Sequence, residues 1–153
     1  MKLENQVVSL ELAKKLKELG VKQDSLFYWG RNGEELFART GIDDTTFGFT
    51  TLNAEGPAGD PYWFDISELD DEDWFSAFTV AELGEMLPAA CHKLSKYGSW
   101  LFLNKKQDEN TWICGYGDNA VSHKDVEANT MVDATASMLI YLIENNLITI
   151  SNV

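Results

Sequence analysis

The chain has 153 residues, of which 44% are hydrophobic and 12% aromatic, a composition typical of a single folded domain over residues 1–153. Its formal net charge of −13 disfavours direct binding to nucleic acid or anionic membrane, and no apolar run approaches the roughly 18 residues of a transmembrane helix. The N-terminus carries charges where a signal peptide needs an apolar stretch, so we expect a cytoplasmic protein. In that reducing compartment Cys91 and Cys114 are expected as small buried side chains, with a disulfide as the alternative.

The first predicted elements are a helix and an aromatic hairpin. Ser9 is expected to cap a helix over residues 10–19, and Gly20 follows the last apolar position of that helix. Residues 25–30 read as a buried aromatic strand, and an Asn-Gly pair then predicts a tight turn into a returning strand over residues 34–39. A lone hairpin is marginally stable in water, so it must pack on another element.

The net charge is concentrated in the next third of the chain. Residues 40–92 contain twelve acids and no lysine or arginine, whereas the rest of the chain contains thirteen acids and twelve bases. Nearly all of the net charge therefore comes from one continuous block, which would attract basic surfaces. The alternative interpretation is that these acids only form a solvated surface that keeps the protein soluble.

Within this block, residues 40–78 are predicted as an acidic, aromatic-rich loop or insert. Residues 47–52 alternate well enough for one short strand, and residues 54–61 are rich in turn formers. Large aromatic side chains among carboxylates are typical of interface anchors, although packing on the core is an equally good interpretation. The candidate partner-binding residues are Trp63, Asp65, Asp70, Asp71, Asp73 and Trp74.

A capping box marks the next helix. Thr79 and Glu82 are three residues apart and can satisfy each other's backbone amides, so a helix is expected over residues 80–87. Residues 89–97 are predicted to be helical again, with Gly98 as the stop.

A second hairpin and a polar connector are expected after Gly98. The predicted strands cover residues 100–104 and 111–116, and residues 117–129 read as a polar connector.

The last predicted helix begins at Met131, after Thr130 as its N-cap, and ends at Asn145-Asn146, because Asn tolerates the left-handed conformation. Its apolar residues cover most of the cylinder, which indicates a buried helix at the centre of the core. The summed pattern predicts an α+β fold with one antiparallel sheet of about four or five strands in hairpins and three helices packed against it.

Motifs that carry chemistry are missing from the sequence. The nitrogen and sulfur candidates for a metal are Cys91, His92, Cys114 and His123, and they have neither a C-x-x-C nor an H-E-x-x-H spacing. There is no nucleophile elbow, phosphate loop or dinucleotide fingerprint. We therefore assign no catalytic residues, no metal site and no cofactor, and a small enzyme with an unrecognised site stays as an alternative.

Three stretches carry a resemblance to a known group of proteins. They are SLELAKKLKELGVKQDSLFYW, FTVAELGEMLP and ATASMLIYLIENNLI. Together they resemble small proteins carried by bacteriophages, prophages and other mobile elements. Each stretch is a helix-capping or core pattern, so the resemblance implies features of the fold and transfers no functional residues.

The sequence leads to a non-enzymatic binding protein as the first hypothesis. The acidic, aromatic segment would engage a basic or nucleic-acid-binding protein, and in a phage setting the carboxylates would imitate the phosphates of nucleic acid. The alternatives are an accessory protein that self-associates as a homo-oligomer and the small enzyme named above.

Overall fold

The computed structural model describes residues 5–30, 36–41, 47–51, 74–95, 97–107, 109–118 and 121–149. Within these ranges the chain forms three helices and seven strands. In chain order they are α1 (Leu10–Glu18), β1 (Phe27–Gly30), β2 (Leu36–Gly41), β3 (Phe47–Thr51), β4 (Trp74–Ser76), α2 (Val80–Met86), β5 (Trp100–Lys105), β6 (Trp112–Gly117), β7 (Ser122–Ala128) and α3 (Met131–Glu144).

The strands form two antiparallel sheets, with the orders β3-β2-β1-β4 and β5-β6-β7. The α+β class is therefore correct, whereas the prediction of one sheet of four or five strands is wrong. Two strands account for the difference. β4 lies in the segment predicted as a loop or insert and pairs with β1 across a long sequence separation, and β7 lies in the predicted polar connector.

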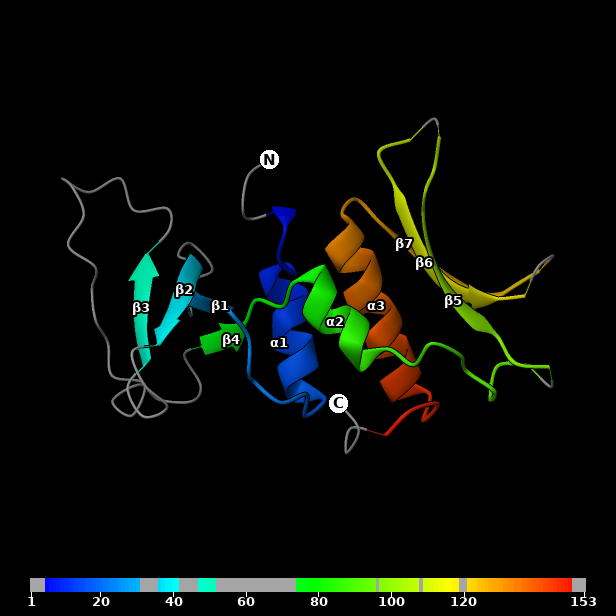
Figure 1. Cartoon of the computed structure of the whole chain (residues 1–153), viewed down its shortest axis with the longest axis horizontal. Helices are drawn as coiled ribbons and strands as arrows, with labels where there is room; N and C mark the ends of the chain where they lie inside the picture. Colours follow the sequence, from blue (N-terminus) through cyan, green and yellow to red (C-terminus); the bar gives the residue numbers. More distant parts are fainter. Residues whose placement is uncertain are drawn as a thin grey trace.

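The three helices lie between the two sheets (Figure 1). In that view the four-stranded sheet is at one end of the molecule and the three-stranded sheet at the other, and α3 runs beside β6 and β7. α1 contacts both α3 and β4, so it joins the helical layer to the four-stranded sheet.

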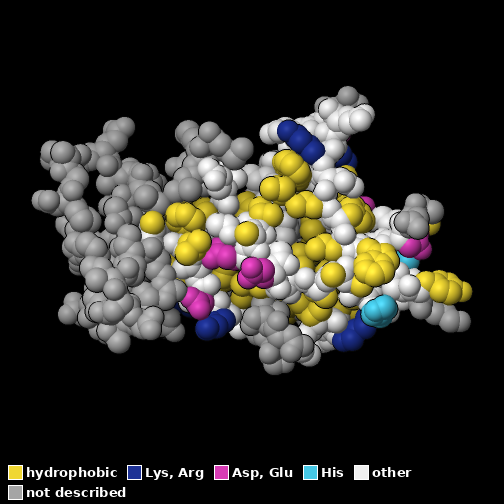
Figure 2. All heavy atoms as spheres, viewed as in Figure 1, with side chains coloured by type: hydrophobic (Ala, Val, Ile, Leu, Met, Phe, Trp, Pro, Cys, Tyr) yellow, Lys and Arg dark blue, Asp and Glu magenta, His cyan; other side chains and the backbone are white. Residues whose placement is uncertain are grey.

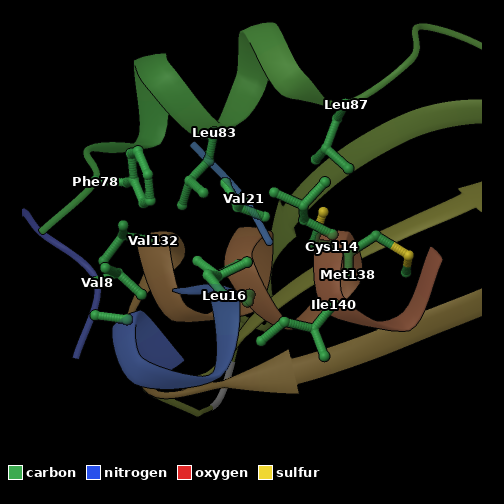
Figure 3. Packing of buried hydrophobic residues seen from close by; sticks show 14 of the residues in the cluster. Val8, Leu16, Val21, Phe78, Leu83, Leu87, Cys114, Val132, Met138 and Ile140 are labelled. Carbon is green, nitrogen blue, oxygen red and sulfur yellow. The ribbon is translucent and has the colours of Figure 1, made fainter. Parts of the chain in front are cut away.

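α3 contributes more than half of its residues to the interior. Nine of its fourteen residues are buried, and Met138, Leu139 and Leu142 have no exposed surface. One cluster of buried apolar residues includes side chains of all three helices together with Trp29 of β1 and Cys114 of β6. Figure 3 shows α2 on one side of this cluster, with Leu83 and Leu87 pointing inward. That α3 is the centre of the core, and that residues 1–153 are one domain, stay predictions that are tested below.

The predicted helix ends are confirmed. The Thr79 hydroxyl accepts from Glu82 N at 3.3 Å while the Glu82 carboxylate accepts from Thr79 N at 2.6 Å, which is the reciprocal capping box. Thr130 Oγ1 accepts from Asp133 N at 3.1 Å. Gly20 at the end of α1 has φ 84°, and Asn146 after α3 has φ 54°. Both adopt the left-handed conformation that ends a helix.

The second helix predicted at residues 89–97 is wrong. Cys91 N donates to Ser99 O at 2.8 Å and Leu101 N donates to Ala89 O at 3.0 Å, so this part of the chain pairs with the start of β5. Tertiary pairing has overridden a weak local helical pattern.

The predicted polar connector is also wrong, because residues 122–128 form β7 at the edge of the second sheet. Val126 and Ala128 pack against the core, and the Lys124 ammonium lies 4.4 Å from the centre of the Tyr141 ring. Exposed charges on the other face protect an edge strand from aggregation, and they also hide its alternating pattern.

Candidate functional site

Only one of the six candidate partner-binding residues is described by the structure. Trp74 opens β4, where it pairs with Gly30 of β1, and its side chain is half-buried. Trp63, Asp65, Asp70, Asp71 and Asp73 lie outside the described residues. The structure therefore places the C-terminal end of the predicted binding segment and does not test whether its residues come together.

Lysines of α1 hold the strand that contains Trp74. Lys17 Nζ donates to Trp74 O at 2.9 Å, and the ammonium groups of Lys14 and Lys17 each lie 5.2 Å from the centre of the Phe75 ring. Such cation–π contacts stabilise by about 0.5–1 kcal/mol at exposed sites. β4 is therefore tied to the helical layer by positive charge at the point where the acidic block ends.

The ends of the acidic segment belong to one sheet. β3 ends at Thr51 and β4 begins at Trp74, and these strands are the two edges of the four-stranded sheet. The 22 residues from 52 to 73 contain eight acids and no lysine or arginine. These eight carboxylates are thus tethered at both ends to the same sheet, with two strands between the tethers.

A Ser–His–Asp arrangement lies near the β6–β7 turn, and the sequence gave no signal for it. Ser99 Oγ is 2.8 Å from His123 Nδ1, and His123 Nε2 is 3.4 Å from Asp118 Oδ2. In the neutral tautomer with the proton on Nε2, Ser99 donates to the ring and the ring points its N–H at the carboxylate. Asp118 also accepts from Val121 N at 3.2 Å, so the group fastens the turn.

This arrangement does not have the properties of a nucleophilic site. Ser99 has no exposed surface, and it lines neither of the two cavities found among the described residues. A nucleophile must reach both its base and the substrate. The geometry therefore supports a structural network that holds β5 against the β6–β7 turn.

The two cysteines are free and buried. Burial raises the pKa of Cys114 to about 11, although a hydrogen bond with Thr135 acts in the opposite direction. Burial, followed by the nearby Cys114 and Cys91 thiols, also raises the pKa of the Tyr116 phenol, whose hydroxyl donates to Pro88 O at 2.6 Å. Both groups thus stay neutral and structural at ordinary pH. Among the described residues no three His, Cys, Asp or Glu side chains form a group that could hold a metal ion.

A cavity of about 660 Å³ lies where the N-termini of α2 and α3 meet the end of the β5–β6 hairpin. Its wall includes Val80 and Ala81 of α2, Met131 and Val132 of α3, and Trp112 of β6. No sequence motif indicated this cavity, because its wall is assembled from short pieces that lie far apart in the chain.

Comparisons with known proteins give no relative: no protein-family model, no curated protein and no solved structure matches this chain. Within the described ranges no helix has the length and apolar character needed to cross a membrane.

Proposed function

We propose that this chain is a non-enzymatic accessory protein of a phage or mobile element that binds a basic protein through its acidic segment, residues 40–78. The observation that carries the proposal is the charge partition, in which residues 40–92 hold twelve acids and no base. A concentrated negative field accelerates association with a basic surface and adds specificity. The two free cysteines are in keeping with a cytoplasmic setting.

The tethering of the segment supports this proposal. Both flanking strands are edges of one sheet, so the eight carboxylates between residues 52 and 73 stay near that end of the molecule. On the face shown in Figure 2, the described acids form a small group near α1 and α2, and apolar side chains occupy much of the remaining surface. The negative charge that would attract a partner is thus provided mainly by the tethered segment.

A nucleic-acid mimic is the specific form that we propose for this protein. Closely spaced carboxylates can replace phosphates in a basic groove, and aromatic side chains such as Trp63 would supply the apolar anchor. The partner would then be a DNA- or RNA-binding protein, and the complex would compete with nucleic acid.

The test begins with capture of partners from host lysate at about 50 mM salt and their release at about 500 mM, since screening weakens charge-driven binding. The dissociation constant of the captured partner is then measured for a variant with Asp70, Asp71 and Asp73 changed to Asn. A control variant with Glu11→Gln, Glu18→Gln and Asp125→Asn removes the same amount of charge elsewhere.

We expect the segment variant to bind about tenfold or more weakly and the control variant to stay within about threefold of the wild type, because only the segment faces the partner. Trp63→Ala should weaken binding by about tenfold or more as well. Added DNA should displace the partner. Equal effects of the two charge variants would reduce the interaction to net charge and overturn the proposal.

Self-association is the second candidate, and an exposed apolar group favours it. Tyr97 and Trp100 are 85% and 64% exposed, and Val121 is 57% exposed near Gly117, the residue that pairs with Trp100. Exposed apolar patches of this kind are typical of interfaces. Sedimentation equilibrium distinguishes the candidates: a dimer that resists salt and dissociates in Trp100→Ser supports self-association, and a monomer at all concentrations contradicts it.

A further inference from the structure

The cavity between α2, α3 and the β5–β6 hairpin has an apolar wall. Phe27, Val80, Met131 and Trp112 are partly buried along it, and Val132 is fully enclosed behind them. Cavities of about 300–1,000 Å³ with such walls are typical of sites for small molecules, and this one has about 660 Å³. The wall would therefore accept the apolar part of a ligand.

The polar side chains around the cavity are mainly neutral amides. Asn5, Gln6, Asn110 and Asn129 are exposed, and none of these amide side chains makes a hydrogen bond with another described residue. They can donate to or accept from a polar group without losing an internal contact.

Lys105 is the one charged residue among the described residues of the wall. Its ammonium lies 5.8 Å from the centre of the Trp112 ring, and it forms no ion pair within the described ranges. Figure 2 shows lysine side chains near the tip of the β5–β6 hairpin with apolar side chains beside them. The arrangement places one cation at the border of an apolar surface.

The acids that lie closest in sequence are already engaged. Glu82 accepts from Leu26 N and Thr79 N, and Asp133 accepts from Ser9 N at 2.9 Å. Glu109 lies 3.6 Å from Lys106 Nζ. The N-terminus of α3 is also satisfied, since Thr130 caps it and Asp133 balances its dipole. The unanswered charge at the cavity is therefore the positive charge of Lys105.

We infer that this cavity binds a small amphipathic molecule with one anionic headgroup. The apolar body would lie against Phe27, Val80, Met131 and Trp112, and the headgroup would meet the Lys105 ammonium. This site is separate from the acidic segment, so its occupancy does not depend on the proposed protein partner.

Decanoate is the probe, and decanol is its uncharged counterpart. Both are titrated into the full-length, isotope-labelled protein, and amide chemical shifts are followed by NMR. We expect saturable shifts at Val80, Ala81, Met131 and Val132, with decanoate bound more tightly than decanol. No saturation, or shifts scattered over the whole protein, would overturn the inference.

Two pairs of variants locate the headgroup and the apolar body. Lys105→Gln should weaken decanoate binding by about three- to tenfold, the usual range for a partly exposed charge pair, and should leave decanol binding unchanged. Lys124→Gln is the matched control, because Lys124 also lies over an aromatic ring but outside the cavity. Equal losses in the two variants would remove the assigned role of Lys105.

The second pair tests the cavity itself. Ala81→Phe places a ring in the cavity and should abolish binding of both probes. Gly84→Phe adds the same bulk on the same helix outside the wall, where a Cβ atom meets nothing within 4 Å, and should leave binding unchanged. Decanoate binding that survives Ala81→Phe would place the ligand elsewhere and overturn the inference.

Discussion

The two sheets adjoin the same helical layer but are assembled in different ways. The strands β5, β6 and β7 follow each other in the chain and lie in that order in their sheet. In the other sheet β1, β2 and β3 are also consecutive, but β4 joins the far edge beside β1 only after the 22 residues that follow β3. One sheet therefore depends on short connections, and the other closes around the acidic segment.

This difference separates the structural and functional parts of the molecule. Closing a longer loop costs more conformational entropy, and non-local strand pairing is slower to form. β4 is also only three residues long and depends on contacts with α1. The four-stranded sheet is thus expected to be the less stable of the two, and it is the sheet that carries the proposed binding segment.

The largest effect is expected where the helices support both sheets. Leu139 of α3 has no exposed surface, and Leu139→Ala should cost about 3 kcal/mol of unfolding free energy through lost packing and the remaining cavity. Urea unfolding measures the loss, and hydrogen exchange at β1 and β6 amides reports on each sheet.

If α3 is the centre of a single domain, both sets of amides lose protection together. Leu26→Ala is the control, because Leu26 is 60% exposed and the same truncation there should cost under about 0.5 kcal/mol. Loss of protection in one sheet alone would contradict the single-domain prediction.

A smaller effect is expected within the three-stranded sheet. A Cβ atom on Gly115 would lie 2.6 Å from Phe102 Cζ and 2.7 Å from Lys124 O, and the carbonyl belongs to the paired backbone and cannot move cheaply. Gly115→Ala should therefore destabilise the protein by about 1–3 kcal/mol in urea unfolding.

Gly84→Ala provides the opposite sign. A Cβ atom at this helical position meets nothing within 4 Å, so the substitution should stabilise the protein by about 0.5–1 kcal/mol. A neutral Gly115→Ala would mean that the β5–β6–β7 surface is more loosely packed than the distances require.

The pH dependence of stability tests the same sheet. Because the pKa of Cys114 rises from its ordinary 9.0 to about 11 on folding, the unfolded chain loses this proton first as the pH increases. The stabilisation is complete below pH 9 and is lost between pH 9 and 11, by about 1–2 kcal/mol.

Urea unfolding at a series of alkaline pH values checks this expectation. In Cys114→Ala the decline should become smaller, and what is left should begin near pH 10, where Tyr116 in the unfolded chain starts to ionise. A decline of the same size in this variant would assign the pH dependence to other groups.

The sequence predicted the elements that are specified locally. The capping box at Thr79 and Glu82, the Asn145-Asn146 stop and the hairpins at β1–β2 and β5–β6 each depend on residues close together in the chain. Such signals act on the backbone directly, so one sequence is enough to recognise them.

The missed features are those created by tertiary contacts. β7 has only Val126 and Ala128 as apolar contacts with the core, and Cys91 pairs with Ser99 although its neighbourhood looks helical. The cavity and the contact between Ser99 and His123 join residues from separate elements. The acidic block was visible from composition, whereas a pocket wall has no composition of its own.

The smallest expected effect concerns the attachment of β4. Lys17→Met removes the hydrogen bond to Trp74 O and one cation–π contact with Phe75, and should cost about 1 kcal/mol. Lys14→Met removes only a cation–π contact at the same 5.2 Å distance and should cost under about 0.5 kcal/mol. Hydrogen exchange at the β4 and β6 amides shows where each loss is located. If the four-stranded sheet is the weaker one, Lys17→Met increases exchange in β4 and leaves β6 protected, because the strand that ends the acidic segment opens without the rest of the fold. Equal increases in β4 and β6 would instead mean that the two sheets open as one unit, and the proposed division between a stable scaffold and a weaker binding end would be wrong.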